Sequence, residues 1–278
     1  MIFGILNTGW GGGTFFKKKC IFTKKRYILK KTGRPPLHPS KGLIMNFTIS
    51  NPNAPGTQFN ELSDEYFIQT FDFFEKKGEE FSTTYKSIQG KLTFTSKSYV
   101  RNLFPFWKNA GLIEYDKFVN KNLFTDLGKI YYHCIHPMQF LHASENDNAV
   151  IYFQHIKQFV IRKAVANIIQ NSEVKYGDVF RRILTHLLEW KKINENEFAL
   201  ILYQMQNGIE KEKFRKLMKS RRNSWSFKVR VKNKKNKSRS IISFSYFINT
   251  LKLANIVKEG DNNYYIINCN MNIIKEMI

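Results

Sequence analysis

The sequence predicts a mainly helical protein of the α+β class, with small β-hairpins and an extended basic N-terminal arm. Three observations indicate this. Apolar side chains recur at helical spacing in several segments after residue 60. Two of these segments end in a glycine or asparagine that precedes a short strand pattern. Turn-forming glycines and prolines are scattered through residues 1–60, which we interpret as the arm.

The first expected helix follows the arm. Asn60 or Ser63 can cap its start, and Gly78 can end it. Its apolar positions are Leu62, Tyr66, Phe67, Phe71 and Phe74. A second helix is expected after Ser96, with Pro105 predicting a kink or a break in it.

A hairpin is expected next. Gly111 can end the second helix in the left-handed conformation, after which Leu112–Tyr115 and Leu123–Gly128 flank the turn-like segment Lys117–Asn122. Helix, helix, glycine stop and hairpin is the order of a winged helix. We therefore expect a first winged-helix subdomain over residues 61–145.

Further helices are expected over residues 149–169, 174–190 and 195–206, and from Glu210 to Asn223. After a helix that resumes at Ser240, the segment Phe247–Val257 matches Leu103–Ile113, with Asn255 standing where Gly111 stands. A turn and a strand over residues 260–267 follow. The sequence therefore predicts a helical connector and a second winged-helix subdomain over residues 146–278.

The net charge of +23 is concentrated in two segments. Residues 1–60 hold ten Lys and Arg and no acid, and residues 211–239 hold fourteen bases against Glu212. The remaining 189 residues have 21 bases and 21 acids. Such clustering is typical of a surface that binds a polyanion, although an AT-rich genome also favours lysine codons.

These observations together predict a protein that binds double-stranded DNA. Basic and polar residues near the start of a recognition helix contact base edges and phosphates in the major groove. The candidate residues come from the arm, the second helix and the basic segment: Arg34, Lys41, Lys97, Arg101, Asn102, Arg221, Arg222, Lys228, Arg230, Lys232, Lys234, Lys235, Lys237 and Arg239. For Arg101 and Asn102 a solvated helix face is an equal alternative.

Catalytic and metal-binding motifs are not evident. Asp178 followed by Glu189-Trp190-Lys191 has the residue types of a magnesium-dependent nuclease, but the pattern is helical, whereas that chemistry places its acids on neighbouring strands. His133, Cys134 and His136 lack a second pair at zinc-finger spacing. We predict no catalytic residue, no metal site and no cofactor in this chain.

The residues from Tyr99 to Tyr131 resemble the first winged-helix subdomain in the DNA-recognition region of type IIS restriction endonucleases. The resemblance rests on Ala110–Tyr115 and Leu123–Lys129; Phe3–Gly9 is loosely similar to the family's N-terminal arm, and Ser238–Ile267 to its later subdomain. It implies monomeric binding to a short asymmetric DNA site. Only Arg101, Asn102 and the segment Lys237–Ser243 are carried over as recognition-helix candidates.

In that family a separate C-terminal nuclease domain cuts outside the site, and this chain stops where that domain would begin. The resemblance therefore implies a recognition subunit that acts with a separate, Mg²⁺-dependent nuclease subunit, or a truncated gene. Two alternatives stay open, a plasmid replication initiator with two winged helices and a complete nuclease. Three separated cysteines and the lack of a long apolar segment predict a cytoplasmic protein without a membrane partner.

Overall fold

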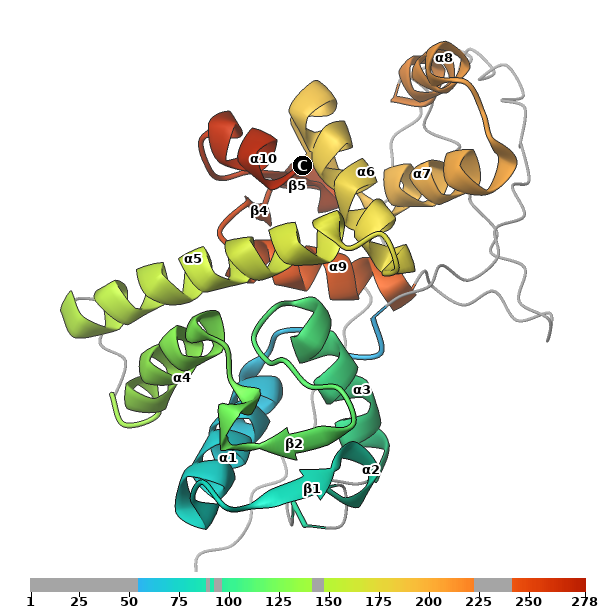
Figure 1. Cartoon of the computed structure of the whole chain (residues 1–278). Helices are drawn as coiled ribbons and strands as arrows, with labels where there is room; N and C mark the ends of the chain where they lie inside the picture. Colours follow the sequence, from blue (N-terminus) through green and yellow to red (C-terminus); the bar gives the residue numbers. More distant parts are fainter. Residues whose placement is uncertain (1–54, 89–90, 93–96, 142–147, 223–241) are drawn as a thin grey trace, which may run out of the picture. The chain divides into compact units, whose positions relative to one another are not determined.

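A computed structural model describes residues 55–88, 91–92, 97–141, 148–222 and 242–278 (Figure 1). The chain divides into two units, residues 1–41 and 42–278, and all described residues belong to the second. Within them helices dominate, and two small antiparallel sheets accompany them. The predicted α+β class is confirmed.

The first module comprises the elements from residue 61 to residue 138. They are α1 (Glu61–Lys77), β1 (Ser82–Thr84), α2 (Tyr85–Ile88), α3 (Lys97–Asn109), β2 (Phe118–Asn120), a 3₁₀ turn (Lys121–Leu123) and α4 (Asp126–Met138). Strand β1 pairs antiparallel with β2, placing Thr83 opposite Val119. The ends of α1 are those predicted: Asn60 accepts a hydrogen bond from the Ser63 amide at 2.8 Å, and Gly78 has φ +76°.

Two local predictions for this module were wrong in part. Helix α3 is continuous through Pro105, so the predicted break is absent; Pro105 is exposed, and the backbone carbonyl four residues earlier belongs to the exposed Arg101. The predicted hairpin is present as a short antiparallel contact: Ile113 pairs with Phe124, and the Glu114 amide donates a hydrogen bond to the Leu123 carbonyl at 2.8 Å. The segment between them, predicted as a turn, contains the strand β2, which pairs with β1. Residues 126–128 instead begin α4, because the Thr125 hydroxyl accepts a hydrogen bond from the Gly128 amide at 3.0 Å and caps the helix.

The second module comprises the elements from residue 175 to residue 277. They are α6 (Lys175–Trp190), β3 (Lys192–Ile193), α7 (Glu195–Asn207), α8 (Lys211–Arg222), α9 (Ile242–Leu253), β4 (Val257–Glu259), a 3₁₀ turn (Asp261–Asn263), β5 (Tyr265–Ile267) and α10 (Met271–Met277). The three strands form one antiparallel sheet in the order β3-β5-β4. The helices predicted over residues 174–190 and 195–206, and from Glu210, are confirmed.

Helices α3 and α9 end in the same way, as the sequence match predicted. In each module three consecutive backbone amides after the helix donate hydrogen bonds back to it, at 2.8 to 3.0 Å. The first bonds to the carbonyl four residues earlier, the second to the one three residues earlier and the third to the one five residues earlier. The donors are Ala110, Gly111 and Leu112 in one module and Ala254, Asn255 and Ile256 in the other. Gly111 has φ +74° and Asn255 φ +54°, so both adopt the left-handed conformation that ends a helix.

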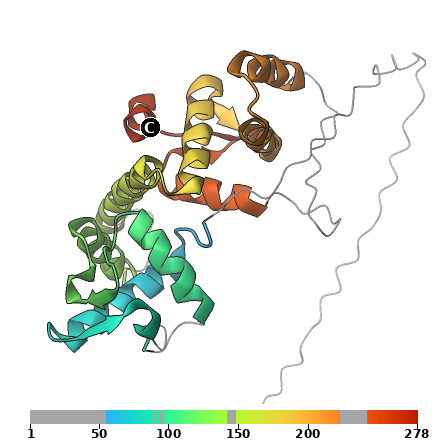
Figure 2. The same ribbon diagram turned by 45° about the vertical axis from the view of Figure 1, so that its right-hand side comes forward.

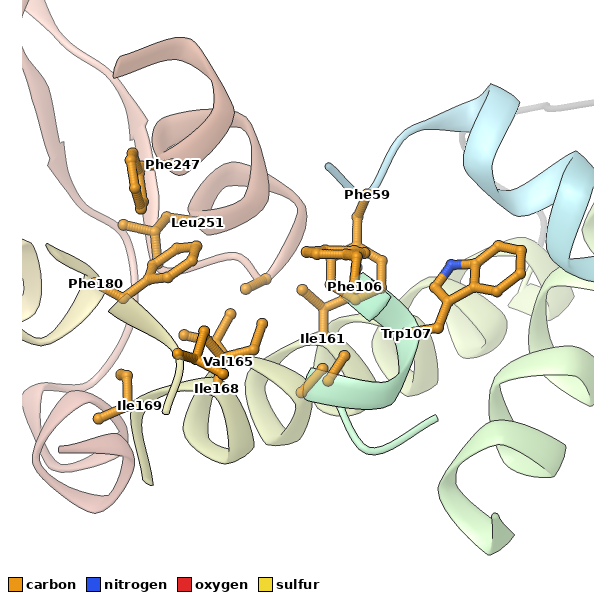
Figure 3. Packing of buried hydrophobic residues seen from close by; sticks show 14 of the residues in the cluster. Phe59, Phe106, Trp107, Ile161, Val165, Ile168, Ile169, Phe180, Phe247 and Leu251 are labelled. Atoms are coloured by element: carbon orange, nitrogen blue, oxygen red, sulfur yellow. The ribbon is translucent and has the colours of Figure 1, made fainter. Parts of the chain in front are cut away.

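Helix α5 (Asn148–Gln170) contacts both of these helix ends. The Asn167 amide donates a hydrogen bond to the Ala110 carbonyl at 3.0 Å, and the Arg162 guanidinium donates one to the Ala254 carbonyl at 2.8 Å. Helix α5 also contributes Ile161, Val165 and Ile168 to the hydrophobic core, all fully buried (Figure 3).

The packed structure starts before residue 60. Phe59, which the sequence placed in the arm, is fully buried and meets the ring of Phe106 edge-on, with centroids 5.0 Å apart (Figure 3). The buried ring fixes residues 55–60 against α3. The predicted arm is therefore limited to residues before Pro55, and these lie outside the described part of the chain.

Candidate nucleic-acid interface

The predicted recognition residues of the first module lie in the first two turns of α3. Lys97 is the first residue of the helix, and Arg101 and Asn102 are both exposed. The Asn102 side chain lies against Gly56, because a Cβ added to that glycine would lie 3.0 Å from the Asn102 amide carbon. Asn102 therefore lies beside the residues that precede α1, whereas Arg101 is exposed on the same turn of α3.

The corresponding helix of the second module is α9. Ser243, part of the predicted recognition segment, is buried with its hydroxyl unpaired among the described residues, so the prediction for this residue was wrong. The reason is helical phase: Ser243 lies beside Phe244 and Phe247 on the core side. The exposed or half-buried positions are instead Ser245, Tyr246, Asn249 and Lys252.

Sequence reasoning missed these α9 residues, although the repeat contained the signal. Aligning Gly111 with Asn255 places Ser245 at the position of Arg101 and Tyr246 at that of Asn102. The aligned lysines behave alike: Lys108 donates to the Tyr115 carbonyl at 2.6 Å, and Lys252 to the Glu259 carboxylate at 2.7 Å. Lys252 in turn lowers the pKa of Glu259 through this hydrogen bond and its charge.

Helix α8 covers the first part of the basic residues 211–239 and adds a basic surface before Lys228–Arg239, the part that we call the basic segment. It buries Phe214 and Met218 against the core and exposes Lys213, Lys216 and Lys219 at intervals of three residues, on one side of the helix. The predicted Arg221 and Arg222 are its last two residues. We call Lys213, Lys216 and Lys219 the α8 lysine stripe.

An ion pair fastens α8 to the second module. Arg215 donates to Glu189 of α6 at 2.7 Å and to Glu212 at 2.9 Å. Both hydrogen bonds raise the pKa of the Arg215 guanidinium, that to Glu189 having the larger effect. The two carboxylates keep Arg215 protonated and offset its positive charge, whereas the residues of the α8 lysine stripe occupy exposed positions of the helix.

The remaining predicted contacts lie outside the described residues. They are Arg34 and Lys41 of the arm and the basic segment residues Lys228, Arg230, Lys232, Lys234, Lys235, Lys237 and Arg239. The structure therefore describes the helices that flank the basic segment, α8 before it and α9 after it.

The candidate nuclease residues are not brought together. Asp178 and Glu189 lie at opposite ends of α6, roughly 16 Å apart along the helix axis at about 1.5 Å per residue. Asp178 pairs with Arg181 at 3.1 Å and Glu189 with Arg215. Such an arrangement does not place two carboxylates on one metal ion.

The histidines of α4 do not converge with Cys134. The Cys134 thiol is buried and donates to the Phe153 carbonyl at 2.8 Å, whereas His133 is exposed. Burial raises the pKa of the Cys134 thiol to about 11. In the described part of the chain no three His, Cys, Asp or Glu side chains are placed to share a metal ion.

A cluster of ionisable side chains connects α1, α4 and α5 in the interior of the first module. Asp64 accepts hydrogen bonds from the Tyr131 hydroxyl and the Lys157 ammonium group. Burial raises the pKa of Asp64 above its ordinary value despite the nearby lysine, and burial also raises that of Tyr131. Because Asp64 and Tyr131 are both buried, we interpret this cluster as a structural contact between the three helices.

Comparison with protein families, with curated proteins and with solved structures found no match to this chain. A search of the described helices found none with the length and apolar character needed to cross a membrane.

Proposed function

We propose that the chain binds double-stranded DNA through two winged-helix units. The observation that carries this proposal is the repeated element order. In each module a helix, a strand and at least one further helix precede the candidate recognition helix, and an antiparallel pairing follows it: the Ile113–Phe124 bridge in the first module and β4 with β5 in the second. The candidate helices α3 and α9 end in the same hydrogen-bonded turn. In a winged helix that last helix enters the major groove.

The charges of the described residues support the same proposal. Arg101 is exposed at the start of α3, the α8 lysine stripe is exposed next to the second module, and the basic segment connects α8 to α9. A duplex carries one negative charge for about every 1.7 Å of its axis, so each of these positive groups can neutralise a phosphate that lies within its reach.

Duplex binding is tested by fluorescence anisotropy over a range of salt concentrations. Lys213, Lys216 and Lys219 are replaced by alanine together, and the matched control replaces Lys76, Lys129 and Lys275, which are also exposed lysines. If the α8 lysine stripe binds phosphates, the slope of log K against log salt falls by about 0.9 for each lysine–phosphate pair removed, hence by up to about 2.7.

The control removes the same net charge from α1, α4 and α10, outside the proposed interface. It should therefore leave the slope close to that of the original protein. Equal changes in the two triple variants would exclude the α8 lysine stripe from the interface. Absence of duplex binding even at low salt would contradict the proposed function itself.

The finer proposal, taken from the resemblance, is that the chain is the recognition part of a type IIS-like restriction system whose nuclease lies on another chain or domain. Selection from random duplexes should then yield one short asymmetric sequence. Arg101→Ala should cost about 1–3 kcal/mol at a single base position. An inverted repeat among the selected sequences would contradict this finer proposal and leave duplex binding intact.

A further inference from the structure

The end of α4 and the first three turns of α5 form an apolar surface. The two helices run side by side in both views (Figure 1, Figure 2), and the Cys134 thiol bonds to the Phe153 carbonyl between them. Three large rings remain exposed here: Phe140 at 70%, Tyr152 at 63% and Phe159 at 50%. Exposed aromatic rings in such a group are typical of a protein interface.

The exposed residues of α5 have the spacing of a helix contact. Tyr152, His155 and Phe159 are all exposed and follow the i, i+3, i+7 pattern, which places them on one side of the helix. We call these three residues the α5 seam. Lys157 lies off this side, because its ammonium group is held by Asp64 against α1.

The charge distribution indicates which partner fits this surface. From Ile130 to Ile156 the sequence has only two charged side chains, Glu145 and Asp147, both acidic, in a chain whose net charge is +23. Two copies of so basic a chain repel each other across the basic segments. The surface from the end of α4 to Ile156 is where two copies can approach without that repulsion. At the far end of the α5 seam the Lys163 ammonium group lies 5.7 Å from the centre of the Phe159 ring and marks the edge of this surface.

We propose that two copies of the chain associate through this surface, with the α5 seam of one copy packed against that of the other. A two-fold axis lets the same residues meet on both sides, as in most homodimers. The proposal does not depend on DNA binding, since it concerns α4 and α5 rather than α3, α8 or α9. It is compatible with monomeric binding to an asymmetric site when the selection of duplexes is carried out at protein concentrations below those at which the dimer forms.

The available area implies a weak dimer. With about 200 Å² for each ring, the exposed parts of Phe140, Tyr152 and Phe159 amount to about 370 Å² in each copy. Two copies with their flanking residues then approach about 1,000 Å², the lower limit of specific interfaces. We therefore expect dissociation in the micromolar range and above, at roughly 10 to 100 μM.

The experiment is sedimentation velocity of the full chain without DNA, from roughly 1 to 200 μM, a range that brackets this dissociation. Phe159→Lys and Tyr152→Lys each introduce a charge into the α5 seam. Phe118→Lys is the control, because Phe118 is 55% exposed on β2, outside the seam. Circular dichroism verifies that each variant keeps its helices, and the milder Phe159→Ser replaces any lysine variant that does not.

We expect the original protein and Phe118→Lys to show the same reversible monomer–dimer equilibrium, and both seam variants to weaken it at least tenfold. A protein that stays monomeric over the whole range would overturn the proposal. A dimer that survives both seam substitutions unchanged would also overturn it, because the copies would then meet elsewhere. If the original protein forms this dimer but does not bind duplex DNA, the proposed function is refuted and this inference stands.

Discussion

Replacing Gly111 by alanine probes the end of α3 directly. Gly111 has φ +74°, where an L residue with a side chain is strained by about 1–2 kcal/mol. The added Cβ would lie 2.4 Å from the Asn167 amide nitrogen, so that amide must move. Moving it breaks its 3.0 Å hydrogen bond to the Ala110 carbonyl, worth about 1 kcal/mol.

The two effects together predict a decrease of about 2–3 kcal/mol in the free energy of unfolding. For a unit of this size each kcal/mol lowers Tm by about 2–4 °C, so we expect a decrease of roughly 5–10 °C. Urea and thermal unfolding followed by circular dichroism at 222 nm measure both quantities. Asn255→Gly, at the equivalent end of α9, relieves left-handed strain instead of creating it and should not lower Tm by a comparable amount.

A double-mutant cycle separates the strain from the collision. With Asn167→Ala the nearest remaining Asn167 atom, its Cβ, is 3.8 Å from the new Cβ, which is ordinary van der Waals distance. Gly111→Ala should then cost only the backbone strain, about 1 kcal/mol less than in the original protein. Equal costs in both backgrounds would refute the steric argument, and a cost below about 0.5 kcal/mol would refute the whole assignment of this turn.

Three further predictions concern other interactions of the first module and α5. Thr125→Val removes the cap of α4 and the 2.6 Å hydrogen bond to the Gly111 carbonyl, so unfolding free energy should fall by about 1–2 kcal/mol, whereas Thr125→Ser should retain most of it. The pKa of Asp64 is raised in the folded state, so its contribution to stability is fully present below pH 3.8 and is lost as the pH rises through the raised pKa. The free energy of unfolding of the original protein, minus that of Asp64→Asn, should therefore fall as the pH rises. A difference that rises with pH would contradict this. At pH 8 a thiol of pKa about 11 is ionised to about one part in a thousand, so Cys134 should react with a disulfide reagent only after unfolding, and rapid native modification would show that the thiol is accessible.

The helices were predictable because their signals are local. Asn60 and Gly78 mark the two ends of α1 in the sequence, and the structure uses both as caps. The match between Gly111 and Asn255 was also visible, since few residues tolerate the left-handed conformation. Each of these signals depends on the conformation of a single residue and its immediate neighbours.

The errors arose where a distant interaction decides. Ser243 was a reasonable surface residue by type, but the packing of Phe244 and Phe247 sets the phase of α9 and turns it inward. Phe59 was assigned to the arm because prolines and glycines surround it, whereas its ring packs on Phe106, far along the sequence. The α8 lysine stripe could not be predicted without knowing which side of α8 is buried, since Phe214 and Met218 set that side.

Helix α5 has a consequence for how the chain unfolds. One helix supplies hydrogen-bond donors to the ends of α3 and α9 and buried side chains to the common core. When α5 frays, the Ala110 and Ala254 carbonyls, which follow the ends of α3 and α9, each lose their hydrogen bond from an α5 side chain. Amide protons of the two junctions, though more than a hundred residues apart in the sequence, should therefore exchange with solvent in the same cooperative opening, and the duplicated units should melt as one.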